Sequence, residues 1–189
     1  MGAFWSSLVV VALAEMGDKT QLIALSLAAR YRRPWSVLAG ILIATLANHA
    51  LASSVGVWVA SRLSAAALTW VLGLGFIAFG IWTLFPDRAE ERARPDRWGP
   101  FLTTAVVFFL AEMGDKTQLA TVALGARYDS ALAVTAGTTA GMMLADGAAV
   151  FAGTSLGRVL PMARIRVVAA ALFFAFGLAA IASGLGLLR

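Results

Sequence analysis

A charged segment of nine residues occurs twice in this sequence. Residues 14–22 read AEMGDKTQL, and the same nine residues return at 111–119. Carboxylates at such close spacing can bind a cation or carry protons, and hydroxyl and amide oxygens follow them directly. The charged residues are Glu15, Asp18, Lys19, Glu112, Asp115 and Lys116, and the neighbouring oxygens belong to Thr20, Gln21, Thr117 and Gln118. The two segments are therefore the first candidates for chemistry.

On a continuous helix, the glutamate and the aspartate of each motif share one face, and the lysine lies within reach of the glutamate. Glycine stands between the two acids, at Gly17 and Gly114. A glycine there weakens the helix and lets the backbone approach a ligand closely. Met16 and Met113 could add thioether ligands, although we favour a packing role because they point away from the glutamates on an unbroken helix.

The elements that carry these charges are predicted to be membrane helices. Of the 189 residues, 60% are hydrophobic and 13% are charged, whereas soluble domains are about 45–50% apolar. A helix needs about 20 mostly apolar residues to cross a bilayer. Six segments meet this requirement, at 4–28, 35–61, 66–85, 100–126, 131–156 and 165–188. The sequence thus predicts an all-α polytopic membrane protein, and the absence of cysteine excludes disulfides and thiolate metal sites.

Charges in the middle of an apolar span must face the protein interior, because each costs about 2.5–3.5 kcal/mol at bilayer depth. One alternative is that Glu15 pairs with Lys19, and Glu112 with Lys116, in purely structural ion pairs. However, the two motifs together hold four carboxylates and two ammonium groups, which leaves two formal negative charges. Two protons or one divalent cation must neutralise them, and alternation between these two states is a cation/proton exchange mechanism.

The donor atoms indicate which cation would bind. Carboxylate, amide and hydroxyl oxygens suit hard cations such as Ca²⁺, Mn²⁺ and Mg²⁺, whereas Zn²⁺ and Cu⁺ favour cysteine or histidine. We therefore expect transported Mn²⁺, with Ca²⁺ as a second or competing substrate, and no cofactor.

The repetition extends beyond the motif, because FIAFG at 76–80 matches FFAFG at 173–177 with the same offset. Three predicted spans lie in each repeat, and an odd number turns the second repeat upside down relative to the first. Inverted repeats of this kind are typical of secondary transporters. We expect a first three-helix repeat at 1–85, a charged cytoplasmic loop at 86–99 and a second, inverted repeat at 100–189.

Basic residues are distributed unequally between the two sides of these spans. The loops that share a side with 86–99 hold ten arginines, and the other side holds three. The positive-inside rule then places the ten-arginine side in the cytoplasm and both termini outside. The formal net charge of +5 is explained by this asymmetry, so no nucleic-acid partner is expected.

Polar residues also interrupt the second span of each repeat. His49 and Asp146 occupy equivalent repeat positions, and Asn48 lies beside the histidine. An ionisable residue in an apolar helix is a functional candidate, as a proton relay or an extra ligand. For His49, simple hydrogen bonding in the core is the favoured interpretation. Asn48 could be a carbonyl ligand or could form hydrogen bonds between helices.

The doubled Glu-x-Gly-Asp-Lys-Thr motif, at 15–20 and 112–117, resembles the signature of the Gdt-type cation/proton exchanger family. This family includes the Golgi manganese/calcium–proton antiporter and bacterial and plastid manganese exporters, and it is grouped with the lysine-exporter superfamily. The resemblance covers essentially the whole chain. It implies that Glu15, Asp18, Glu112 and Asp115 handle the cation and that the lysines and threonines complete each motif. The short chain is similar to bacterial members, which implies a bacterial inner membrane.

Other functions fit the sequence less well. An intramembrane aspartyl protease resembles a Gly-x-Gly-Asp pattern, but Glu15 and Glu112 stand at the position of its first glycine, so we expect no enzyme. An amino-acid or other small-solute exporter of the same superfamily is the main alternative, although the excess of carboxylates disfavours it. The expected partners are a divalent metal ion, protons and the lipid bilayer, and a homo-oligomer is left open.

Overall fold

The described residues of the computed structural model, 2–85, 98–152 and 162–186, are helical and contain no strand. The helices are α1 (Ala3–Glu15), α2 (Lys19–Tyr31), α3 (Pro34–Ala60), α4 (Ala65–Thr83), α5 (Gly99–Glu112), α6 (Lys116–Tyr128), α7 (Ala131–Ala152) and α9 (Met162–Gly184). The all-helical prediction is confirmed. Most of the predicted charged loop, residues 86–97, lies outside the described part of the chain.

Three described helices are long and apolar enough to cross a membrane, namely α3, α4 and the segment Val167–Gly184 of α9. The spans predicted at 4–28 and 100–126 are not continuous helices, because each is divided into two shorter ones. In both, the division falls inside the repeated motif. The 22-residue α7 is long enough to span, but its threonines and Asp146 make it more polar than these three.

Local sequence explains where several helices begin and end. Pro34 occupies the first turn of α3, where its missing N–H is not needed, and the Ser64 hydroxyl accepts a hydrogen bond from the Ala67 N–H at the start of α4. Arg32 and Asp129 adopt left-handed backbone conformations just after α2 and α6. These two ends are equivalent in the repeats, and both fall in gaps between the predicted spans.

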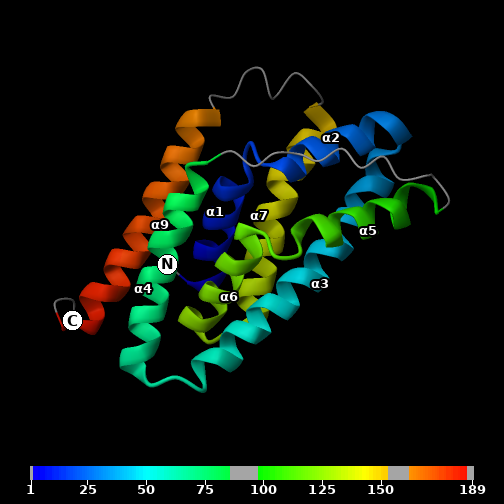
Figure 1. Ribbon diagram of the computed structural model, residues 1–189. Coiled ribbons are helices and arrows are strands. Elements are labelled where there is room, and N and C mark those ends of the chain that lie inside the picture. The colour runs from blue at the N-terminus through cyan, green and yellow to red at the C-terminus, as the bar shows by residue number, and fades with distance from the viewer. Residues whose placement is uncertain (1, 86–97, 153–161, 187–189) are drawn as a thin grey trace.

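The two halves of the chain interlock in the bundle. Helix α1 packs along α7 and α5 packs along α3, so the first helix of each half lies against the long third helix of the other half. Helices α4 and α9 run side by side (Figure 1). Small residues make these crossings close. A Cβ atom on Gly40 would lie 2.7 Å from the Phe101 carbonyl oxygen, and one on Gly141 would lie 2.6 Å from that of Leu8. Such contacts are typical of membrane helices.

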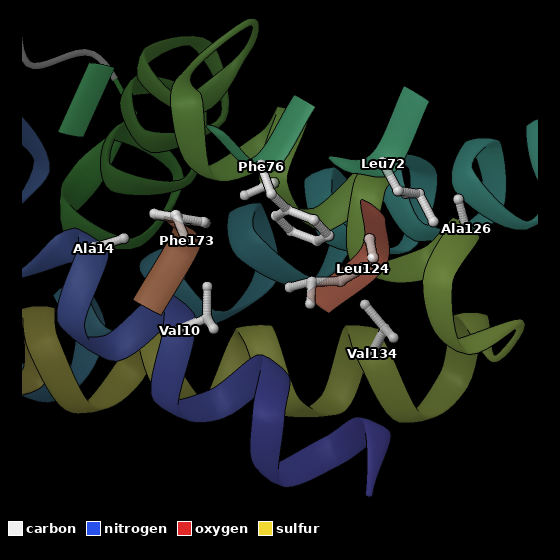
Figure 2. Packing of buried hydrophobic residues seen from close by; sticks show 10 residues of the cluster. Val10, Ala14, Leu72, Phe76, Leu124, Ala126, Val134 and Phe173 are labelled. Atoms are coloured by element: carbon white, nitrogen blue, oxygen red, sulfur yellow. The ribbon is translucent and has the colours of Figure 1, made fainter. Parts of the chain in front are cut away.

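A cluster of apolar side chains joins the halves, as Figure 2 shows. Phe76 and Phe173, which are equivalent in the repeats, stack with their ring centroids 6.3 Å apart. Val10, Leu124 and other buried residues surround them. In lipid, such a core gains from close van der Waals contact more than from removal of apolar surface from water. The cluster joins α1, α4, α6, α7 and α9.

Candidate metal centre

Each repeated motif forms a break between two helices. Helix α1 ends at Glu15 and α2 begins at Lys19, while Gly17 has a φ of +83°. The second motif repeats this geometry, with a φ of +78° at Gly114. An α-helix cannot continue through such a backbone conformation. The interpretation of the motif acids as one face of an unbroken helix is therefore wrong, since it assumed that tertiary contacts would not open the chain at the glycine.

Side chains of the motif accept hydrogen bonds from backbone N–H groups at this break. The Gln21 Oε1 atom accepts a hydrogen bond from the Gly17 N–H at 2.8 Å, and Gln118 does the same for Gly114 at 2.7 Å. Asp18 caps the start of α2 by accepting from the Lys19 N–H at 2.8 Å. Asp115 caps α6 in the same way at 2.7 Å. Both glutamines thus serve the bend, in addition to any role toward a ligand.

The lysines form ion pairs across the two repeats. The Lys116 ammonium lies 3.0 Å from Asp18, and the Lys19 ammonium lies 3.5 Å from Asp115. The first pair is almost fully buried, with 5% of the Lys116 side chain exposed, against 23% for Lys19. The alternative of lysine–glutamate pairs within each motif does not describe this structure. Because α1 and α5 end at the glutamates, each lysine is directed toward the opposite motif.

Three carboxylates from both motifs converge. Oxygen atoms of Glu15, Glu112 and Asp115 all lie within 4.8 Å of one another, and all three residues are buried. Glu15 accepts hydrogen bonds from the hydroxyls of Thr20, at 2.7 Å, and Thr117. Neither oxygen of Glu112 has a hydrogen-bond partner among the described residues. Oxygen atoms grouped in this way can hold a hard divalent cation.

Asp18 lies in its ion pair with Lys116 and is not one of the three grouped carboxylates. Its role as a ligand stays a prediction. Asp146 is also buried, and its charge lies close enough to interact with those of Glu15, Asp18 and Glu112. With it, five carboxylates and two ammonium groups share the interior, which raises the formal excess to three negative charges.

Other polar residues join α3 and α7 to the two broken helices by hydrogen bonds. Asn48 donates from its amide to the Phe109 carbonyl at 3.0 Å, near the end of α5 where carbonyls lack helical partners. The Gln118 amide donates to the side-chain oxygen Oδ1 of Asn48 at 3.5 Å, and the Gln21 amide donates to the backbone carbonyl of Ala145 at 2.9 Å. His49 is fully buried, and neither ring nitrogen has a hydrogen-bond partner in the described part of the chain.

Sequence reasoning missed the contacts that cross between the repeats, above all the hydrogen bond from Thr117 to Glu15. It also missed the buried hydroxyls of Ser53, Thr135 and Thr138. An inverted repeat with a charged motif in each half could have suggested that the motifs meet. Nothing in the spacing of one motif shows which side chain of the other it contacts.

A helical bundle with two broken helices and a buried group of carboxylates at their breaks is the architecture of an ion transporter. The family model for the divalent cation/proton antiporter GDT1 matches residues 3–91 and 100–186. The chain belongs to the GDT1 family of divalent cation/proton antiporters.

Relatives with similarity over most of their length support this assignment. The chain is 48% identical over 174 residues to a Vibrio cholerae protein named "Putative manganese exporter", covering 92% of this chain and 87% of that protein. It is 31% identical over 215 residues to GDT1-like protein 5 of Arabidopsis thaliana, covering 93% of each. A GDT1-like protein of Synechocystis is 28% identical over 196 residues, covering 92% of this chain and 94% of the relative. No solved structure matches the chain.

Proposed function

We propose that this protein exports Mn²⁺ in exchange for protons, with Ca²⁺ as a second or competing substrate. The observation that carries this proposal is the buried group of carboxylates from Glu15, Glu112 and Asp115, which draws on both motifs. The name of the Vibrio cholerae relative supports manganese as the cation and export as the direction.

The chemistry of the site favours a hard cation. Its donors are carboxylates and the neighbouring hydroxyls of Thr20 and Thr117. The thioether of Met113 is directed elsewhere, since 55% of that residue is exposed. Oxygen donors without thiolate suit Mn²⁺ and Ca²⁺ better than Zn²⁺ or Cu⁺.

The glutamates are the proposed proton carriers. Asp18 and Asp115 each cap a helix N-terminus and face an ammonium group, and both contacts favour the charged form of a carboxyl group. Glu15 and Glu112 lie opposite each other without an ammonium partner in any described ion pair. Protons would therefore bind the glutamates as the metal leaves, while the aspartates stay ionised.

Alternating access would be a rocking of one three-helix repeat against the other. The close glycine contacts of α3 with α5, and of α7 with α1, provide surfaces with few protruding side chains. The proposed location is a bacterial inner membrane with both termini outside, so that the arginine-rich loops lie in the cytoplasm.

Export of an amino acid is the alternative, and the site disfavours it. An amino-acid substrate needs a cationic group for its carboxylate, but Lys19 and Lys116 already pair with Asp115 and Asp18. No observation in the structure favours this substrate over a cation.

Purified protein in proteoliposomes tests the proposal directly. We expect an outward-directed Mn²⁺ gradient to drive proton movement in the opposite direction, measured with a pH-sensitive dye inside the vesicles. Glu15→Gln and Glu112→Gln keep the side-chain shape but cannot titrate, and each should abolish the exchange while the protein stays folded. Thr69→Val is the control and should leave the exchange unchanged, because Thr69 is a half-buried residue of α4 whose hydroxyl donates to the Ala65 carbonyl of its own helix.

Two results would overturn the proposal. If vesicles that contain the wild-type protein transport neither Mn²⁺ nor Ca²⁺, the proposed function is excluded. Near-normal exchange with an unchanged pH dependence in either glutamine variant would exclude the paired-glutamate mechanism, and Asp146 or His49 would then become the candidate proton carrier.

A further inference from the structure

A cavity of about 310 Å³, which we call the α4–α6–α9 cavity, lies between these three helices. Its described lining residues come from the first turns of α4, the last turn of α6 and the last two turns of α9, and none of them belongs to the repeated motifs. The cavity therefore lies at the end of the bundle where α4 begins and where α6 and α9 end (Figure 1). With the predicted orientation, this end reaches the outer headgroup layer of the membrane.

The wall of the α4–α6–α9 cavity combines apolar side chains with one cation. Leu68, Leu72 and Ala180 are apolar, Ser183 contributes a hydroxyl, and Arg127 brings a positive charge. None of the described lining residues is acidic. A cavity of this composition fits a ligand that has an anionic group next to hydrocarbon.

Aromatic rings hold the Arg127 guanidinium in place. Its central carbon lies 5.7 Å from the ring centroid of Tyr128, which also lines the cavity, and 5.4 Å from that of Phe176 on α9. Phe176 in turn packs on Phe76, with ring centroids 5.6 Å apart. Contacts with aromatic rings position a guanidinium without using its N–H groups.

The Arg127 side chain carries a buried donor that the described part of the chain does not satisfy. Its Nε atom is buried and has no hydrogen-bond partner there, and Arg127 takes part in neither of the described ion pairs. Buried polar groups are nearly always hydrogen-bonded. A guanidinium can bind two oxygens of one phosphate at once. These observations point to an anionic ligand beside Arg127.

We infer that the α4–α6–α9 cavity binds the headgroup of an anionic phospholipid, with the lipid phosphate on Arg127. The position at a membrane face and the apolar wall favour a lipid over free phosphate, and basic pockets between membrane helices are known to bind anionic headgroups. A zwitterionic headgroup fits less well, because its ammonium group would find no carboxylate among the described lining residues. The Ser183 hydroxyl donates to the Ala179 carbonyl at 2.9 Å, so its oxygen can accept a hydrogen bond from a glycerol headgroup.

Thermal unfolding in detergent, with and without added lipid, tests the site. We expect phosphatidylglycerol at saturating concentration to raise the melting temperature of the wild-type protein by about 4–8 °C, since a ligand that binds only the folded state stabilises it. Phosphatidylethanolamine with the same acyl chains, and inorganic phosphate, should each give a much smaller shift. An equal shift with phosphatidylethanolamine would overturn the assignment of an anionic headgroup. An equal shift with inorganic phosphate would overturn the assignment of a lipid.

Substitution of Arg127 tests where the lipid binds. We expect Arg127→Gln to weaken phosphatidylglycerol binding at least about tenfold, as loss of a hydrogen bond to a charged group does, measured by native mass spectrometry. Arg62→Gln is the matched control and should keep the wild-type affinity. Arg62 is exposed on the same predicted side of the membrane and its guanidinium lies 5.5 Å from the ring centroid of Trp58, but it does not line the cavity.

A second variant leaves Arg127 in place. Ser183→Phe puts a large side chain into the cavity from the end of α9, where Ser183 is exposed, and it should also lose the rise in melting temperature. Each variant is compared with itself without lipid, so a change in its own stability does not affect the result. Wild-type affinity for phosphatidylglycerol in either variant would overturn the inference. These measurements need neither metal nor transport, so they do not depend on the proposed function.

Discussion

At the scale of single residues, the charges of the site are held by partners from the opposite motif. Lys116 pairs with Asp18, and Thr117 donates to Glu15. Neither motif therefore completes its own electrostatics. In the proposed mechanism, this arrangement would couple the protonation or metal loading of one half to the position of the other, because movement between the halves would change both contacts.

The two ion pairs differ in burial, which leads to a prediction on stability. Lys116→Ala leaves Asp18 charged in a buried site, and loss of one partner of a buried pair costs about 3–5 kcal/mol. We expect a clear fall in the melting temperature of the purified protein in detergent. Lys19→Ala is the matched variant, and it should have a smaller effect because 23% of the Lys19 side chain is exposed. A larger effect of Lys19→Ala would contradict this ranking.

At the scale of elements, the break inside each motif depends on glycine. Gly114 has a φ of +78°, and a Cβ atom added there meets nothing within 4 Å. Any effect of a substitution must then come from backbone strain. Glu112, at the end of α5, and Lys116, at the start of α6, take their positions from this bend.

We predict that Gly114→Ala destabilises the protein by about 1–2 kcal/mol, the usual cost of a left-handed conformation for a residue with a Cβ. Gly114→Asn should cost less, since asparagine tolerates this conformation better. The melting temperatures of both variants in detergent give the measurement. Equal stability of the alanine variant and the wild type would show that the bend does not need glycine.

A second glycine acts through close packing. A Cβ on Gly56 of α3 would overlap the Val122 carbonyl of α6. We expect Gly56→Ala to destabilise the protein by about 1–3 kcal/mol, as overpacking does. Gly75→Ala on α4 is the control, because a Cβ there meets nothing within 4 Å and alanine favours the helix. Similar melting temperatures of the two variants would exclude a tight α3–α6 contact.

At the scale of the whole molecule, interlocking of the halves decides how the site can move. Helices α1 and α5 carry the glutamates, and each packs on a helix of the other half, α1 on α7 and α5 on α3. In the proposed rocking of one half against the other, each helix that carries a glutamate would therefore slide along the helix of the other half on which it packs. The orientation of this assembly in the bilayer is a prediction from the distribution of basic residues.

Orientation can be tested with single cysteines. Ala89→Cys, which lies outside the described residues, and Ala3→Cys should react with a membrane-impermeant maleimide from opposite sides of the membrane. We expect Ala3→Cys to react in intact cells and Ala89→Cys only after the membrane is opened. Labelling of both positions from the same side would contradict the predicted arrangement of six spans.

The sequence alone predicts the helical membrane architecture, the repetition of the motif and the excess of buried carboxylates. These properties depend on composition, span length and net charge, which do not depend on how the helices pack. Helices also end within the gaps that the predicted spans leave at residues 29–34 and 127–130, and the next helices begin at Pro34 and Ala131, since signals such as a proline in the first turn of a helix act locally. The opening of the motif helices at Gly17 and Gly114 was decided by tertiary contacts. The same holds for the partners of Lys19 and Lys116 and for the hydrogen bond from Thr117 to Glu15. Those contacts join residues about a hundred positions apart, and only the packed bundle brings them together.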